Sequence, residues 1–204
     1  TRRTRLTVGP VDPPARRTKV LPRLRRPLED RARTQSVPPA PPRAAEVERS
    51  AEPTRALFAA EGFETDIVRA HEGAPPAVIA HKAGPAGAPT VLLYAHHDVQ
   101  PENNHADWDS PPFEPTERGD RLYGRGAADD KAGIMAHIAS IRAVAEVIGD
   151  DLELGIAMFI EGEEEYGSRS FAPFLADHKD ALRADAIVVA APGTSDPWTP
   201  GLPV

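Results

Sequence analysis

The chain has 204 residues, of which 40% are hydrophobic, contains no cysteine and carries a formal net charge of -7. The lack of cysteine excludes disulfide scaffolds, cysteine zinc fingers and thiol nucleophiles. No apolar run approaches the roughly 20 residues that span a bilayer, so we expect no transmembrane helix and no membrane partner. The first residues lack the apolar core of a secretory signal peptide, which together with the missing cysteine favours the cytoplasm.

Basic residues and prolines gather in residues 1–43, which hold 12 Lys/Arg against 3 Asp/Glu and nine of the 23 prolines. Pro-Pro steps such as Pro13-Pro14 oppose regular helix, and the segment has little apolar surface to bury. We therefore expect a solvated, poorly ordered leader. A basic arm for nucleic acid is the alternative, but no aromatic residue is present to stack on bases and the rest of the chain is acidic.

Strands and helices alternate from residue 44 onward. Apolar runs predict strands at 64–69, 77–81, 90–95, 152–160 and 186–190. Helical spacing predicts helices at 44–61, 131–148 and 168–182. This alternation predicts an α/β domain with a mostly parallel sheet flanked by helices. Because sites in such sheets form at the carboxyl ends of strands, the residues after each strand are the candidates for chemistry.

His96 and Asp98 directly follow the strand predicted at 90–95. They are two residues apart, so they project from the same side of an extended chain. Imidazole is a common zinc ligand, and a nearby carboxylate can orient its ring. A polar turn with an incidental histidine fits these residues equally well, so the motif alone does not distinguish a metal site from such a turn.

Acidic residues form two further groups. Asp129 and Asp130 precede the helix at 131–148, where they could simply complement the helix N-terminus or could bind metal ions. Four acids lie within residues 161–165, after a strand, and like charges this close repel unless a cation lies among them. Neighbouring carboxylates in extended chain point to opposite sides, so one can bind a metal while the other acts as a general base. A solvated acidic loop is the alternative.

Three stretches in order, LLYAHHDVQP, WDSPPFEPTERGDRLYGRGAADDKAG and EGEEEYGS, resemble the signatures of one metallohydrolase family. It contains dipeptidases, carnosinases, acetylornithine and succinyl-diaminopimelate deacylases, aminoacylases and carboxypeptidase G. The resemblance covers about residues 46–190, and the DVQP, SPPFEP and DDK details are similar to the dipeptidase-like branch. It implies a zinc exopeptidase-like catalytic domain.

The resemblance also implies a centre with two divalent metal ions, zinc or else manganese or cobalt. By position, His96, Asp129 and Glu165 would be metal ligands. Asp129 would bridge both ions, and its peptide bond to Asp130 would be cis.

Two catalytic roles follow from the same resemblance. Asp98 would orient the imidazole of the first metal ligand, and Glu164 would be the general base that takes a proton from water. The resemblance gives no role to His97, Glu161 and Glu163. His137 lies off the apolar stripe of its predicted helix, so we expect it to be exposed.

The chain departs from the family pattern near its end. The family has an acidic metal ligand after the strand predicted at 186–190, where this chain has Ala191. The next acid is Asp196, whose proposed replacement of that ligand would need a rerouted loop. The small dimerisation and lid domain and a late histidine ligand are not found before Val204. We therefore expect residues 44–204 to be a truncated catalytic domain without the family's homodimer.

Together these features predict metal-dependent hydrolysis of the amide bond of dipeptides or short peptides, with no nucleic-acid partner. An N-acyl amino acid deacylase of the same family would need only a different substrate pocket. A catalytically incompetent fragment is the second alternative, because of the missing ligands. The motifs do not separate these three hypotheses.

Overall fold

The computed structural model describes residues 13–38, 44–190, 194–196 and 199–200. Its centre is a five-stranded sheet in the order β1-β2-β6-β3-β7. These strands are β1 (Glu64–Val68), β2 (Ala77–Lys82), β3 (Thr90–His96), β6 (Gly155–Glu161) and β7 (Ala186–Val189). β2 is antiparallel to both of its neighbours, whereas β3 is parallel to β6 and β7. Four of the five strands therefore run in one direction, and the predicted α/β fold is confirmed as a mixed sheet flanked by helices.

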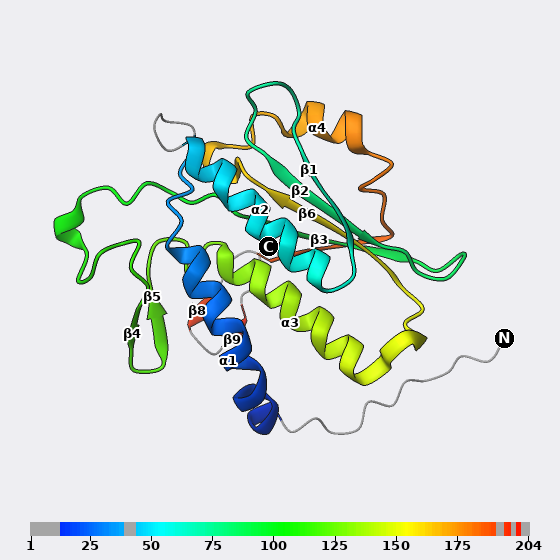
Figure 1. The fold of residues 1–204 in the computed structure, drawn as a ribbon, viewed down its shortest axis with the longest axis horizontal. Coiled ribbons are helices and arrows are strands. Elements are labelled where there is room, and N and C mark those ends of the chain that lie inside the picture. Colours follow the sequence, from blue (N-terminus) through cyan, green and yellow to red (C-terminus); the bar gives the residue numbers. More distant parts are fainter. Residues whose placement is uncertain (1–12, 39–43, 191–193, 197–198, 201–204) are drawn as a thin grey trace.

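Helices cover both faces of the sheet (Figure 1). On one face, α2 (Ala44–Ala60) and α3 (Lys131–Ile148) pack against apolar residues of the central strands, and α1 (Pro13–Ala32) lies beside α3. On the other face, α4 (Phe171–His178) packs its buried Phe174 onto a second apolar cluster. In the part of the chain described here, no helix is both long enough and apolar enough to cross a membrane.

Smaller elements lie outside the central sheet. They are the hairpin β4 (Thr116–Arg118) and β5 (Arg121–Tyr123), the pair β8 (Thr194–Asp196) and β9 (Thr199–Pro200), and short 3-10 helices at His105–Asp107, Gly149–Asp151 and Glu164–Tyr166. The hairpin projects away from the sheet (Figure 1). The carboxyl ends of β3 and β6 lie together because His96 is paired with Glu161 in the ladder. This edge of the sheet is where the functional side chains are found.

The N-terminal segment corrects one expectation for residues 1–43. α1 is a helix of 20 residues, and the Pro13-Pro14 step occupies its first turn, where a missing N–H breaks no helical hydrogen bond. Two leucines of α1 pack against the core, and the buried Lys131 donates from Nζ to the carbonyl oxygens of Arg31, in the last turn of α1, and of Thr34, just after it. The described part of the predicted leader is therefore packed on the domain. Residues 1–12 and 39–43 lie outside the described residues.

The prediction that His137 is exposed is wrong. Its side chain is buried, with 5% of the residue exposed, because α3 is covered on more than its apolar stripe. Nε2 of His137 lies 2.9 Å from the carbonyl oxygen of Tyr94, which can only accept, so Nε2 carries the proton. Burial lowers the pKa of His137, and the hydrogen bond to Tyr94 only partly opposes that effect.

We predict that replacing His137 by Gln removes one pH-dependent contribution to the stability. Below about pH 6.5 the unfolded chain binds a proton at His137 that the folded protein does not, so the contribution of His137 to the stability falls as the pH falls. Glutamine keeps an N–H donor but does not titrate. Urea unfolding at pH 5, 6 and 7 should therefore show that the wild-type stability falls relative to that of the variant as the pH falls, by up to about 1.4 kcal/mol per pH unit. A stability difference between the two proteins that stays constant with pH would contradict the burial of a neutral His137.

Candidate metal centre

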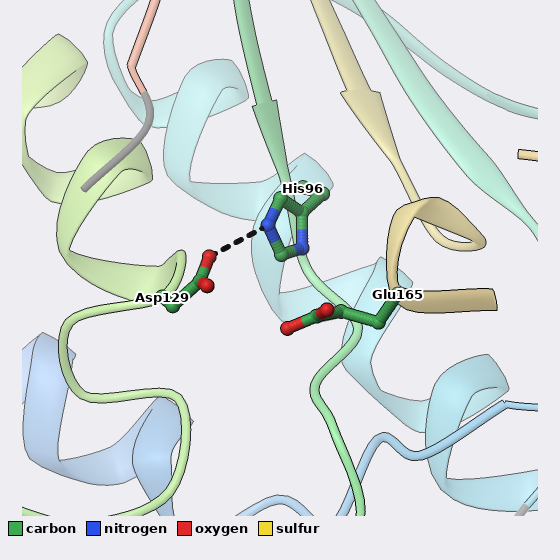
Figure 2. A group of neighbouring side chains, drawn as sticks. All are labelled: His96, Asp129 and Glu165. Carbon is green, nitrogen blue, oxygen red and sulfur yellow. Dashed lines mark hydrogen bonds and ion pairs between the residues drawn. The ribbon is translucent and has the colours of Figure 1, made fainter. Parts of the chain in front are cut away.

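Three side chains from distant segments meet at the carboxyl edge of the sheet. His96 ends β3, Asp129 lies in the turn before α3, and Glu165 lies in the 3-10 helix that follows β6. Figure 2 shows their side chains pointing toward one another from these three elements. One potential ligand atom from each lies within 4.8 Å of the others. The structure thus brings together the three residues that the sequence predicts as metal ligands.

Asp98 lies beneath this group and is fully buried, with none of its surface exposed. Its carboxylate accepts the backbone N–H of Glu164 at 3.3 Å and that of Glu165 at 2.9 Å. Nδ1 of His96 lies 3.1 Å from the carbonyl oxygen of Asp98 and 3.3 Å from its Oδ1. Both of these oxygens are acceptors, so Nδ1 carries a proton. One buried carboxylate therefore connects the end of β3 with the loop after β6.

The other ring nitrogen of His96 faces acids. Its Nε2 lies 3.0 Å from Oδ1 of Asp129 and 3.8 Å from Oε2 of Glu164. Burial lowers the pKa of His96, but the hydrogen bond to Asp98 and the surrounding negative charges outweigh it and raise the pKa to about 10. Burial also raises the pKa of Glu165. A cation placed among these acids would relieve both the repulsion between them and the cost of their burial.

The turn before α3 positions a further carboxylate. The Asp129–Asp130 peptide bond is cis, as predicted. Asp130 is buried, and its Oδ2 accepts the backbone N–H of His96 at 3.1 Å. A Cβ atom at Gly133 would lie 2.1 Å from Oδ1 of Asp130, so glycine is required in the first turn of α3. The close packing of this helix turn on Asp130 fixes the neighbouring Asp129.

The acidic loop is held by residues to which the sequence assigned no role. Glu161 accepts a hydrogen bond from the hydroxyl of Tyr94 at 2.7 Å, and Oε2 of Glu163 accepts the backbone N–H of Ser170 at 2.8 Å. A Cβ atom at Gly162 would lie 2.3 Å from the carbonyl oxygen of Pro76, so only glycine fits between these two acids. The first two acids of the run, Glu161 and Glu163, therefore hold the loop in place, and Glu164 and Glu165 remain for chemistry.

Two side chains that contact Glu161 or Glu165 were not predicted from the sequence. Tyr94 lies two residues before His96, on the same side of β3, and Gln100 lies two residues after Asp98. The amide of Gln100 donates to Glu165 through Nε2. The period of two along the extended segment was a signal that could have indicated both positions.

The remaining predicted position falls at the end of the chain. Ala191, which stands where the family has an acid, lies outside the described residues. Asp196 is described only as part of the backbone of β8. Its proposed replacement of the missing ligand therefore stays a prediction.

The donor set fits a divalent cation. It consists of one imidazole nitrogen and two carboxylate oxygens, which suit zinc and related ions. The side chain of Asp129 is 48% exposed and that of Glu164 is 43% exposed, whereas His96 and Asp98 are buried. The group is thus supported from inside the protein and open to water or a substrate on its outer side.

The chain is similar to known dipeptidases in sequence and in fold. The chain is 41% identical over 117 residues to cysteinylglycine-S-conjugate dipeptidase of Corynebacterium striatum, a match that covers 57% of this chain and 25% of that protein. It is 36% identical over 118 residues to human Beta-Ala-His dipeptidase, covering 57% of this chain and 23% of that protein. The structure of human carnosine dipeptidase 1 superposes with a TM-score of 0.77 at 26% identity, covering 87% of this chain and 40% of that one.

The fold is that of a metallopeptidase catalytic domain, and His96, Asp129 and Glu165 form a candidate metal-binding group within it. The family model described as Peptidase family M20/M25/M40 matches residues 92–201, just over half of the chain, and the chain belongs to this family. The family implies divalent metal ions, for which the group of His96, Asp129 and Glu165 offers a candidate site. The matched segment spans about a quarter of the length of the curated relatives named above.

We predict that replacing Asp98 by Asn lowers the pKa of His96 from about 10 toward 6.5 or below. The burial that lowers this pKa remains in the variant, whereas the negative charge beside Nδ1 is lost. NMR titration of the imidazole signals in the metal-free protein, assigned with His96→Gln, measures the change. Asp177→Asn, at an exposed acid on α4, is the matched control. An unchanged titration of His96 in Asp98→Asn would show that Asp98 does not set its charge.

Proposed function

We propose that this chain supplies the metal-binding part of a metallo-exopeptidase of dipeptidase type, which hydrolyses the amide bond of dipeptides or short peptides. The observation that carries the proposal is the group His96, Asp129 and Glu165, whose ligand atoms lie within 4.8 Å of one another. The matched relatives are dipeptidases, and this supports a dipeptide as substrate over an N-acyl amino acid.

The proposed centre holds two divalent ions, zinc or alternatively manganese or cobalt. His96, Asp129 and Glu165 would hold them. When bound, such ions act as Lewis acids that polarise a carbonyl group and lower the pKa of water. Because the imidazole of His96 must lose its Nε2 proton to bind a metal, metal affinity should increase with pH.

Two further side chains, Glu164 and Asp98, are proposed to act beside the metal ligands. Glu164 is proposed as the general base that accepts a proton from water and later passes it to the leaving amine. Its backbone is held by Asp98, its carboxylate lies near Nε2 of His96, and its side chain is partly exposed to the solvent from which substrate arrives. Asp98 is proposed to keep Nδ1 of His96 protonated, so that Nε2 is the nitrogen that faces the metal.

Two alternatives from the sequence stay open as predictions. A deacylase of the same family would use the same centre with a different acyl group in the substrate. A catalytically incompetent fragment would result if the ligand missing at Ala191 is not replaced. The cytoplasmic location and the lack of a nucleic-acid partner likewise stay predictions from the composition.

We predict that replacing Glu164 by Gln leaves metal binding intact and lowers hydrolysis by about 10²- to 10⁴-fold. Glutamine keeps the size of the side chain but cannot accept the proton at neutral pH. Metal content by mass spectrometry and hydrolysis of a dipeptide panel with added zinc, manganese or cobalt measure the two effects. Glu146→Gln, on the exposed side of α3, is the matched control.

The possible results separate the hypotheses. An active Glu164→Gln variant would show that another group is the base. Hydrolysis of N-acyl amino acids without hydrolysis of dipeptides would favour the deacylase. A wild-type chain with neither stoichiometric metal nor activity would favour the incompetent fragment.

A further inference from the structure

Gln100 contacts Glu165 in two places. Its Nε2 donates to Oε2 of the Glu165 carboxylate at 2.7 Å and to the Glu165 carbonyl oxygen at 3.2 Å. Both partners are acceptors, so the amide nitrogen, and not the amide oxygen, must face them. The side chain of Gln100 thereby links the carboxylate of Glu165 to its own backbone.

Gln100 acts together with Asp98 on the same residue. The two side chains are two positions apart on an extended segment, and Asp98 accepts the backbone N–H of Glu165 at 2.9 Å. Glu165 is therefore held at its N–H, at its carbonyl oxygen and at its carboxylate from one short segment after β3. These contacts restrict the rotamers of a flexible side chain that would otherwise be free at the open side of the site.

The chemistry of the donor matters at this position. A lysine or arginine beside Glu165 would neutralise the carboxylate and compete with a metal ion for its charge. A neutral amide holds one oxygen without removing that charge, and the carboxylate keeps lone pairs for a cation. Among the described residues, Glu165 accordingly has a hydrogen bond from the amide of Gln100 and no ion pair with a Lys or Arg.

We infer that Gln100 is a positioning residue of the metal centre, whose amide holds the Glu165 carboxylate in the orientation in which it binds a divalent cation. The inference rests on the proposed function and adds a residue to it. Gln100 is exposed, so replacing it should disturb the site and not the core. Outer partners of this kind typically change metal affinity by about 10- to 100-fold.

The test compares Gln100→Met with Gln35→Met in the full chain. Methionine keeps the length of the side chain but has no N–H donor, and Gln35 is the other glutamine of the chain and is also exposed. Co²⁺ affinity by chelator competition and the visible spectrum of bound Co²⁺ report the centre. We expect Gln100→Met to weaken Co²⁺ binding by about 10- to 100-fold and to change the spectrum, with an unchanged melting temperature of the metal-free protein. Gln35→Met should behave as wild type.

A second measurement needs no metal. In the metal-free protein, the NMR signals of the Gln100 side-chain NH₂, identified by their loss in Gln100→Met, should shift toward free-amide values when Glu165 is replaced by Ala. Equal Co²⁺ affinity and spectrum in wild type and Gln100→Met would overturn the inference while the proposed function stands. A wild-type chain that binds no Co²⁺ would contradict the proposed function, and NH₂ signals unaffected by Glu165→Ala would then overturn the inference as well.

Discussion

The site depends on one buried charge, the carboxylate of Asp98. Burying an ionised carboxylate is costly unless hydrogen bonds and opposite charge compensate it. Here the compensation comes from the N–H groups of Glu164 and Glu165 and from the imidazole of His96. The groups that form hydrogen bonds with Asp98 thus belong to the residues that carry the proposed chemistry. The buried charge is therefore compensated only when these residues have the geometry of the site.

The sheet makes this requirement possible. β3 and β6 are parallel neighbours, so the residues that leave their carboxyl ends emerge at the same edge. α3 begins at that edge as well, and Asp130 accepts the backbone N–H of His96 there. Three segments that are distant in the sequence are therefore fixed relative to one another by the pairing of two strands and by the hydrogen bond from the His96 backbone to Asp130, before any side chain contributes a metal ligand. The acid-rich loop then acquires its shape from Glu161 and Glu163, which face inward.

Much of the fold could be predicted from the sequence, because the patterns that indicate strands and helices lie in neighbouring residues. Strand alternation and the apolar stripe of α3 are properties of neighbouring residues, and the bounds of α3 at 131–148 agree with the structure. α1 could not be predicted from its own residues, because it depends on packing against α3 and on the contact with Lys131, and both partners are distant in the sequence. The contacts of Gln100 and Glu161 were missed for a related reason, since each depends on which distant loop comes to lie against it.

The most direct test is anomalous diffraction from crystals grown with Zn²⁺, recorded on both sides of the zinc absorption edge. The account predicts anomalous density in contact with His96, Asp129 and Glu165, with Asp98 hydrogen-bonded to the opposite side of the His96 ring. Crystals that contain stoichiometric zinc bound elsewhere, with no density among these three side chains, would contradict it.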